Sequence, residues 1–381
     1  MALLEVNDLT VSFHTIDGIV QAVRGVSFSV DRARTLGIVG ESGSGKTVST
    51  LSLIGLVPGA RVSGQALFEG RDLLTMPPDE MRSVRGAKVA AIFQDPLSSL
   101  HPLYRVGWQV VEMIRAHENT SKAKARRRAL DLLRLVGIPN AERRLDDYPH
   151  EFSGGMRQRA MIAMALALNP ALIIADEPTT ALDATVQAQI IDLLTRLQRE
   201  FDSALIMITH DLGVIADVAD DVMVMYAGRG AEQADLRTIY YQPHHPYTRG
   251  LLESIPGATG AGERLRPIPG QPPSLLNPPS GCAFHPRCRY VMDRCITDAP
   301  TLDLEVGPGH RSACWLPADS RGMSEEAARI RDDAVLEGRS APAEAIAARL
   351  AASTEMPTPA AVGTGEADAR DGSVGVREDR R

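Results

Sequence analysis

The chain lacks any apolar run of about eighteen residues, the length that a membrane-spanning helix needs. Its N-terminus, Met1–Glu5, also lacks the basic stretch and apolar core of a secretory signal. We therefore expect neither a transmembrane segment nor a signal peptide, and a protein that works in the cytosol. The composition of the 381 residues is ordinary for a soluble globular protein, with room for one large α/β domain and an appended module.

An excess of positive charge is also missing. The net charge is −7, which argues against nucleic acid as the main partner, because a duplex binder usually carries a basic face. The densest basic cluster, Lys122–Arg128, falls in a helical stretch, where a run of charges is usually a solvated surface.

Lysine and cysteine are scarce. The lysines are Lys46, Lys88, Lys122 and Lys124, and the cysteines are Cys282, Cys288, Cys295 and Cys314. Lys46 lies in a glycine-rich loop, where an ammonium group is required if the loop binds phosphate. The cysteines all fall within residues 282–314, which a random scatter would not produce.

The glycine-rich loop fits the pattern G-x-x-x-x-G-K-[ST], which is typical of phosphate binding. It consists of Gly40, Glu41, Ser42, Gly43, Ser44, Gly45, Lys46 and Thr47. The loop follows a buried strand, Thr35–Val39, and opens a helix from Lys46 to about Leu56. Its backbone N–H groups would surround phosphate oxygens, Lys46 would neutralise the β and γ phosphates, and Thr47 would ligate Mg²⁺.

Two carboxylates end a second apolar strand, at Asp176 and Glu177 after residues 171–175. Asp176 would hold Mg²⁺ through water, and Glu177 would act as the general base that polarises the attacking water. Adjacent carboxylates repel each other unless a cation is near. Alone, the pair would fit a solvated loop equally well, but the phosphate loop favours the catalytic interpretation.

Two further polar residues follow apolar strands. Gln94 ends the run Val89–Phe93, and its amide is able to touch Mg²⁺ or water. His210 follows Leu205–Thr209, where an imidazole is able to bond the γ-phosphate. Each signal is weak alone, since a single histidine at a strand end is more often structural; their shared position at strand ends supports a site.

Strand and helix patterns alternate as in a parallel α/β sheet. Residues 3–30 favour an antiparallel pair of strands that turns at Asp17-Gly18. Helical spacing then predicts an inserted lobe with helices over Val106–His117, Ser121–Val136 and Gly154–Leu168. The alternation resumes with a strand at 171–176, a helix at Ala184–Glu200, and strands at Ala204–Thr209 and Asp221–Tyr226.

We expect four regions. Residues 1–94 and 170–230 form the nucleotide-binding core with an N-terminal β subdomain, and 95–169 form the helical lobe. Frequent prolines after Gly230 mark 231–318 as a separate C-terminal extension that holds the cysteines. Residues 319–381 form a low-complexity tail, in which Ser324–Ala351 could form a helix and 353–381 are expected to be disordered.

These motifs, in this order, resemble those of ATP-binding-cassette ATPases. The matching positions are the phosphate loop 40–47, Gln94, Ser153-Gly154-Gly155, the acidic strand 171–177, Ala181-Leu182-Asp183 and His210. The resemblance implies an α/β P-loop NTPase core with an antiparallel β subdomain, an inserted helical lobe and, here, a cysteine-containing C-terminal module. It also implies ATP hydrolysis with Mg²⁺ held through Thr47, Gln94 and Asp176.

The resemblance gives several residues roles between subunits. Ser153 and Gly155 of the signature would serve the γ-phosphate bound by the other subunit, and a Gly-Gly helix start has the free N–H groups for it. The signature departs from the commonest form at Phe152 and Met156, but its Ser-Gly-Gly core is kept. Residues 181–183 would be a dimer-contact loop, and His210 the switch.

Phe13 aligns with the aromatic residue that stacks on adenine in this family. A core phenylalanine that points inward from a strand is an equally good interpretation of the same position.

The cysteines leave several chemistries open. Disulfides are rare in the cytosol, which leaves buried thiols, zinc or an iron–sulfur cluster. The C-x₂-C pairs usual in zinc sites are absent, but spacing alone does not separate zinc from a cubane cluster. His245–Thr248, Pro269–Leu275 and Gly281–Cys288 resemble the extension of oligopeptide and dipeptide importer ATPases. In that subfamily the cysteines are associated with a [4Fe-4S] cluster, which the resemblance implies here as a structural group at Cys282, Cys288, Cys295 and Cys314.

The resemblance implies an ATPase that energises peptide import from the cytoplasmic face of the cell membrane. Its expected partners are a homologous ATPase, two membrane permeases and an extracytoplasmic peptide-binding protein. Import of nickel or glutathione by the same machinery is an alternative, because cargo choice lies in the other subunits. A soluble ATPase acting on nucleic acid is less favoured, because neither a coiled-coil insertion nor a second cassette is visible.

Overall fold

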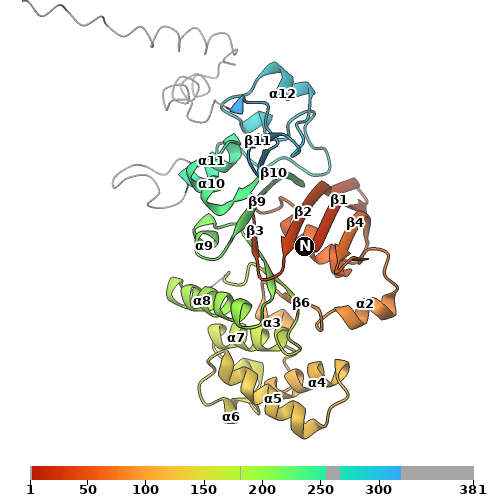
Figure 1. The fold of residues 1–381 in the computed structure, drawn as a ribbon, viewed down its shortest axis with the longest axis vertical. Helices are drawn as coiled ribbons and strands as arrows, with labels where there is room; N and C mark the ends of the chain where they lie inside the picture. The colour runs from red at the N-terminus through yellow and green to blue at the C-terminus, as the bar shows by residue number, and fades with distance from the viewer. Residues whose placement is uncertain (1, 181, 255–266, 319–381) are drawn as a thin grey trace, which may run out of the picture. The chain divides into compact units, whose positions relative to one another are not determined.

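A computed structural model describes residues 2–180, 182–254 and 267–318 of the chain (Figure 1). Ala181 of the expected dimer-contact loop, the expected helix at Ser324–Ala351 and the tail at 353–381 lie outside the described residues. Within the described ranges, no helix is long and apolar enough to cross a membrane.

The N-terminal part forms a four-stranded antiparallel sheet in the order β2-β1-β4-β5. Its strands are β1 (Ala2–Thr15), β2 (Gly18–Asp31), β4 (Ala60–Phe68) and β5 (Arg71–Asp72). The hairpin turns at the expected place, since Thr15 pairs with Gly18. Both strands are long, and register shifts between Val6 and Leu9 and between Leu9 and Thr10 mark bulges in their pairing.

The second sheet of the described chain has eight strands in the order β11-β12-β10-β9-β3-β8-β7-β6. Its parallel part comprises β3 (Thr35–Val39), β6 (Val89–Ile92), β7 (Leu172–Asp176), β8 (Ala204–Thr209) and β9 (Asp221–Tyr226). Every residue of β3, β7 and β8 is buried, which is why these strands appear as continuous apolar runs in the sequence.

The helices of the core and lobe include those predicted from the sequence and several shorter ones that were not predicted. They are α1 (Lys46–Leu51) with the 3-10 turn η1 (Ser52–Ile54), α2 (Pro78–Val84), α3 (Pro96–Ser99), α4 (Val106–His117), α5 (Lys122–Leu135), α6 (Ala141–Arg144), η2 (Pro149–Glu151), α7 (Gly154–Ala165), α8 (Ala184–Glu200) and α9 (Leu212–Ala216). The expected helix after the phosphate loop is shorter, because Gly55 ends it in a left-handed conformation with φ 63°.

Helices α4, α5 and α7 form the lobe that the sequence predicted. They pack around fully buried side chains such as Val110, Leu133 and Ile162. Figure 1 shows α4, α5 and α6 gathered beyond α7, which lies between them and α8. Helix α7 thus joins the lobe to the sheet, since it also contacts β6 and α8.

The C-terminal extension is continuous with the core sheet. Its strands are β10 (Arg229–Asp235), β11 (Glu305–Gly307) and β12 (His310–Ser312), and β12 pairs with β10, which pairs with β9. Its helices are α10 (Leu236–Tyr241), α11 (Pro246–Glu253), the 3-10 turn η3 (His285–Arg287) and α12 (Asp293–Thr297). The extension therefore shares a backbone hydrogen-bond network with the core.

Candidate functional site

The glycine-rich loop connects β3 to α1 and turns tightly against its neighbours. Gly40 has φ 152°, and a Cβ atom there would lie 2.2 Å from the carbonyl oxygen of Met225. Gly45 has φ 98°, and a Cβ atom there would lie 2.4 Å from the carbonyl oxygen of Ala22. Glycine is needed at both positions, because the backbone of a neighbouring segment lies too close to leave room for a Cβ atom.

Lys46 points back into the loop. Its Nζ donates hydrogen bonds to the carbonyl oxygens of Gly40 at 2.7 Å and Glu41 at 3.0 Å, and the residue is 5% exposed. Burial lowers the pKa of Lys46, while the carboxylates of Glu177, Asp176 and Glu41 oppose that shift. The hydroxyl of Ser44 is buried with no hydrogen-bond partner among the described residues. A buried ammonium and an unpaired hydroxyl in a cradle of glycines fit a phosphate group.

Thr47 and Asp176 bring two oxygen ligands together beside this cradle. The Thr47 hydroxyl donates to Asp176 Oδ1 at 2.7 Å. Burial raises the pKa of Asp176, and the neighbouring Glu177 adds to that effect, whereas Thr47 and Lys46 lower it. A hydroxyl bonded to a carboxylate next to the phosphate loop suits Mg²⁺, which prefers oxygen ligands and keeps several waters.

Glu177 is the point where three side chains meet. Gln94 Nε2 donates to Glu177 Oε2 at 3.1 Å, the Thr180 hydroxyl donates to the same oxygen at 2.9 Å, and His210 Nδ1 lies 3.3 Å from Glu177 Oε1. Glu177 itself has φ 44°, a left-handed conformation that is uncommon for this residue type and concentrates at functional sites. The structure thus brings the expected residues Gln94 and His210 to one carboxylate.

An open cleft runs along these residues. Its lining comprises Ala22, Glu41, Ser42, Gly43, Gly45, Lys46, Thr47, Val48, Gln94, Glu177, Thr180, His210, Leu251, Pro272 and Leu275. Leu251, Pro272 and Leu275 come from the C-terminal extension, whose segment 267–281 is tied to β2 by a hydrogen bond from Gln21 N to Leu275 O at 3.1 Å. Sequence analysis did not predict that the extension lines the cleft, nor that Thr180 bonds Glu177.

Phe13 is not among the residues that line the cleft. It lies in β1, pairs with Val20 and Ala60, and packs half-buried against the core of the antiparallel sheet. These contacts fit the interpretation of Phe13 as a phenylalanine that packs inward from a strand. Adenine stacking at Phe13 stays a prediction.

The signature residues lie apart from the cleft of the same chain. Ser153 caps α7 by accepting the N–H of Met156 at 3.3 Å, and both Ser153 and Gly154 are exposed. A Cβ atom at Gly155 would lie 2.9 Å from Val186 Cγ1 in α8. Since Ser153, Gly154 and Gly155 are absent from the cleft lining, one chain holds a phosphate loop and a signature that do not meet.

The four cysteines line one small cavity. None forms a disulfide. Burial raises the pKa of the Cys282 thiol and raises that of Cys314 to about 12, which keeps both protonated. Over the described ranges, no three His, Cys, Asp or Glu residues are grouped so as to hold a metal ion. The [4Fe-4S] cluster that the resemblance implies therefore stays a prediction.

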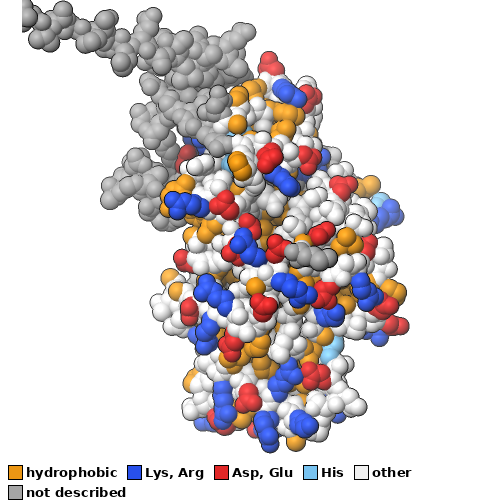
Figure 2. Space-filling model, viewed as in Figure 1, with side chains coloured by type: hydrophobic (Ala, Val, Ile, Leu, Met, Phe, Trp, Pro, Cys, Tyr) orange, Lys and Arg blue, Asp and Glu red, His pale blue; other side chains and the backbone are white. Residues whose placement is uncertain are grey.

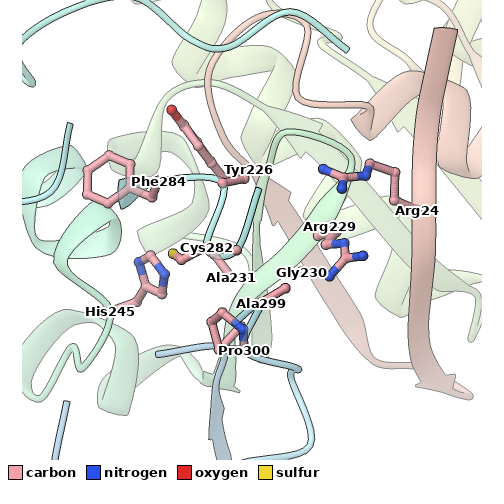
Figure 3. A pocket seen from close by; sticks show the side chains of 13 residues that line it. Arg24, Tyr226, Arg229, Gly230, Ala231, His245, Cys282, Phe284, Ala299 and Pro300 are labelled. Atoms are coloured by element: carbon pink, nitrogen blue, oxygen red, sulfur yellow. The ribbon is translucent and has the colours of Figure 1, made fainter. Parts of the chain in front are cut away.

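A second small cavity adjoins the cysteines (Figure 3). Cys282, His245, Phe284 and Pro300 line both cavities. Figure 3 shows the guanidinium groups of Arg24 and Arg229 on the opposite side from Phe284 and His245. Burial lowers the pKa of Arg24, and the nearby charge of Arg229 lowers it further. In the described structure, Arg24 Nε and Nη1 and Arg229 Nε are buried without a hydrogen-bond partner.

Comparison with known proteins shows which family the chain is similar to. A family model described as "ABC transporter" matches residues 23–180, and one described as "Oligopeptide/dipeptide transporter, C-terminal region" matches residues 231–295. Two relatives come from Escherichia coli. The chain is 51% identical to the oligopeptide transport ATP-binding protein OppD over 84% of this chain and 94% of that protein. It is 48% identical to the dipeptide transport ATP-binding protein DppD over 84% of this chain and 99% of that protein.

The fold has solved counterparts. The dimeric bacterial ABC transporter cassette MJ0796 is 28% identical, with a TM-score of 0.56 over 61% of this chain and 99% of that one. The fold and the cleft together define an ATP-binding-cassette ATPase with a P-loop NTPase core, an enzyme that couples ATP hydrolysis to transport. The chain belongs to the oligopeptide/dipeptide transporter family of ATP-binding proteins.

Proposed function

We propose that this chain is the ATP-hydrolysing subunit that energises import of dipeptides or oligopeptides across the cytoplasmic membrane. The observation that carries the hydrolytic part is the convergence of Gln94, Thr180 and His210 on the carboxylate of Glu177, beside the phosphate loop. The peptide cargo rests on the similarity to OppD and DppD, which are named for oligopeptide and dipeptide transport. Import of nickel or glutathione by the same machinery is the alternative cargo.

The residues of the cleft have distinct proposed roles. Backbone N–H groups of Gly40–Thr47, with Lys46, bind the phosphates of ATP. Thr47, Asp176 and Gln94 hold Mg²⁺, which when bound supplies positive charge against the developing charge on the phosphates. Glu177 accepts a proton from the attacking water, and His210 contacts the γ-phosphate. In this structure Gln94 bonds Glu177, so the same amide also orients the base.

The second half of each site comes from a partner. Ser153, Gly154 and Gly155 sit at the start of α7, and this chain's own cleft lacks them. The free N–H groups of such a helix start suit the γ-phosphate of ATP held by another subunit. We propose a related, non-identical ATPase as that subunit, so that nucleotide binding closes the pair.

The proposed contact surface for two membrane permeases lies on the helical lobe. Leu97, Leu103, Tyr104 and Trp108 are 57%, 76%, 46% and 40% exposed. They follow Gln94 in the chain, in α3, the next loop and α4, and Tyr104 stacks on Trp108 with ring centroids 4.3 Å apart. Clustered exposed apolar side chains commonly mark protein contacts. A lobe that moves with Gln94 would pass closure of the ATPase pair to the permeases.

The proposed setting is the cytoplasmic face of the membrane, where the chain is a peripheral subunit and an extracytoplasmic protein delivers the peptide. The division into a core of 1–94 and 170–230, a lobe of 95–169, an extension of 231–318 and a tail of 319–381 is part of this proposal.

A role on nucleic acid is less favoured. On the face drawn in Figure 2, basic and acidic side chains are interspersed and form no continuous basic stripe, whereas a nucleic-acid-binding protein usually has one.

We further propose that the four cysteines bind a [4Fe-4S] cluster that stabilises the extension. Two observations support it. All four thiols line one cavity. Arg24 and Arg229, with unpaired guanidinium nitrogens, line the adjoining cavity together with Cys282, so their charge would partly offset that of an anionic cluster. Protein purified without oxygen should be brown and contain iron and sulfide. A colourless preparation with stoichiometric zinc, or with no metal, would reject the cluster.

The function is tested by purifying the tagged full-length chain from membranes of its own cells and identifying its partners by mass spectrometry. Two permeases and a second ATPase should copurify, and peptide should stimulate ATP hydrolysis of the reconstituted assembly. Stimulation by nickel or glutathione instead would select the alternative cargo. Recovery of a solitary chain whose ATPase responds to DNA would reject the transport function.

A further inference from the structure

One buried arginine links the C-terminal extension to the phosphate loop. Arg287, the last residue of η3, donates from Nη1 to Glu41 Oε2 at 2.6 Å and from Nη2 to Glu41 Oε1 at 2.9 Å. The Arg287 side chain is 5% exposed and that of Glu41 is 26% exposed. A two-point bond between guanidinium and carboxylate is among the strongest and most directional contacts that side chains make.

The extension also holds the backbone of Glu41. The hydroxyl of Tyr247, in α11, accepts the N–H of Glu41 at 2.8 Å, and Tyr247 is fully buried. Glu41 is thus fixed at its carboxylate and at its N–H by two residues of the extension.

Arg287 is in turn held in place by its surroundings. Its Nε donates to the carbonyl oxygen of Pro269 at 2.8 Å, and Nη1 lies 3.3 Å from the Tyr226 hydroxyl. Its guanidinium carbon lies 5.8 Å from the centroid of the Tyr226 ring and 6.0 Å from that of Phe284, two rings that are labelled in Figure 3. These contacts leave the guanidinium group little freedom to turn away from Glu41. Because Cys288 follows directly and lines the cysteine cavity, Arg287 joins that cavity to the phosphate loop.

The charge of Glu41 makes this contact relevant to ATP. Glu41 lines the cleft beside Lys46, so an uncompensated carboxylate there would repel a triphosphate. Burial lowers the pKa of Arg287, but its bonds to Glu41 and Tyr226 outweigh burial and raise it, so the guanidinium group stays charged. The carboxylate is therefore neutralised by a residue that does not itself line the cleft.

We propose that Arg287 is a positioning residue of the ATP site, which neutralises and anchors Glu41 so that the affinity for ATP depends on the C-terminal extension. The inference rests on the proposed function, in which Gly40–Thr47 binds ATP. Removing Arg287 would release one anchor of the loop and expose the negative charge of Glu41 to the phosphates.

The first test measures binding of a fluorescent ATP analogue with Mg²⁺ to the full-length chain. Arg287→Met should raise the Kd about tenfold, equivalent to about 1.4 kcal/mol. In the assembled transporter the same change should raise KM and leave kcat nearly unchanged, because Arg287 does not touch the reacting groups. The matched control is Arg289→Met, which breaks a 3.1 Å ion pair with Glu253 in the same extension and should bind as wild type.

A second variant separates this role from general damage to the fold. Adding Glu41→Gln to Arg287→Met removes the unneutralised charge, so the Kd should return to within about threefold of the wild-type value. A structural defect would not be relieved by that change. The proposal is wrong if Arg287→Met binds as wild type, or if Glu41→Gln in the Arg287→Met background fails to restore binding.

Lys46→Ala tells the two proposals apart. If Lys46→Ala binds the analogue normally, the assignment of the ATP site itself is wrong. If Lys46→Ala loses binding while Arg287→Met does not weaken it, the ATP site stands and the role of Arg287 is rejected.

Discussion

Thr47 donates a hydrogen bond to Asp176 across 2.7 Å, although 129 residues separate them in the chain. The contact exists because β3 and β7 both lie beside β8 in the parallel sheet, so the loop after β3 and the end of β7 meet at the same edge. This edge places the phosphate loop, the proposed Mg²⁺ ligands Thr47 and Gln94 and the proposed general base Glu177 along one cleft, with Asp176 beside Thr47.

Replacing Glu177 by glutamine should stop hydrolysis and keep binding. The amide would hold the contacts to Thr180 and His210 but would not accept a proton from water. We expect turnover at this chain's site to fall by about 10²–10⁴-fold in the assembled transporter, with ATP binding nearly unchanged. Single-turnover hydrolysis measures the loss, and Glu200→Gln at the exposed end of α8 is the matched control. Normal turnover at this site would reject Glu177 as the base.

Replacing Asp176 by asparagine should alter the Mg²⁺ requirement. Loss of one anionic oxygen beside Thr47 should raise the Mg²⁺ concentration for half-maximal ATPase activity by about ten- to a hundredfold. A titration of activity against Mg²⁺ measures the shift, with Asp192→Asn, an exposed position in α8, as control. An unchanged Mg²⁺ titration would mean that Asp176 does not help to hold the ion.

Two glycines of the phosphate loop should differ in their tolerance of alanine. At Gly45 the new Cβ would lie 2.4 Å from the carbonyl oxygen of Ala22, so that backbone must move, at a cost of roughly 1–3 kcal/mol in the free energy of unfolding. At Gly43 nothing lies within 4 Å and only the left-handed conformation is penalised, by about 1 kcal/mol. Urea unfolding of Gly45→Ala and Gly43→Ala compares them; equal losses would contradict the crowding at Gly45.

The extension should lose stability in mild acid because of His245. Burial lowers the pKa of His245 from 6.5 to about 4, against the opposing charge of Glu232. The folded protein therefore keeps His245 neutral while the unfolded chain takes up a proton below pH 6.5. Its contribution is complete above pH 6.5 and is lost as the pH falls from 6.5 to about 4, by up to roughly 3 kcal/mol.

His245→Asn tests this prediction. Asparagine keeps an acceptor for the N–H of Tyr247, which now bonds His245 Nδ1 at 3.1 Å, but does not titrate. The variant should show a smaller loss of unfolding free energy between pH 6.5 and 4.5 than the wild type. An identical pH dependence in the two proteins would show that another group is responsible.

Much of the core could be predicted from the sequence. The strands at 204–209 and 221–226 and the helices at 106–117 and 184–200 have the expected bounds, because their periodicity is regular and their ends carry caps such as Asp183. The loop at 40–47 and the carboxylates Asp176 and Glu177 are short motifs, and binding of phosphate and Mg²⁺ requires particular residue types there. The sequence therefore led to a P-loop ATPase and to the transporter family.

Other parts of the site had no local signal. Arg287 and Glu41 lie 246 residues apart, and nothing in either neighbourhood indicates that they meet. The pairing of β12 with β10 could not be predicted, because a strand of three residues such as β12 is too short to show a sequence pattern. Thr180 shows no pattern that separates it from an ordinary loop residue. These features depend on tertiary packing, which periodicity and spacing do not encode.

The central claim is that ATP is held between two ATPase subunits. The most direct test is a structure of the assembled transporter carrying Glu177→Gln, trapped with ATP and Mg²⁺. We predict that the γ-phosphate on this chain's Lys46 is contacted by the partner's signature helix, and that Ser153 of this chain reaches the γ-phosphate on the partner. A trapped complex in which Ser153 lies far from any nucleotide would contradict the account.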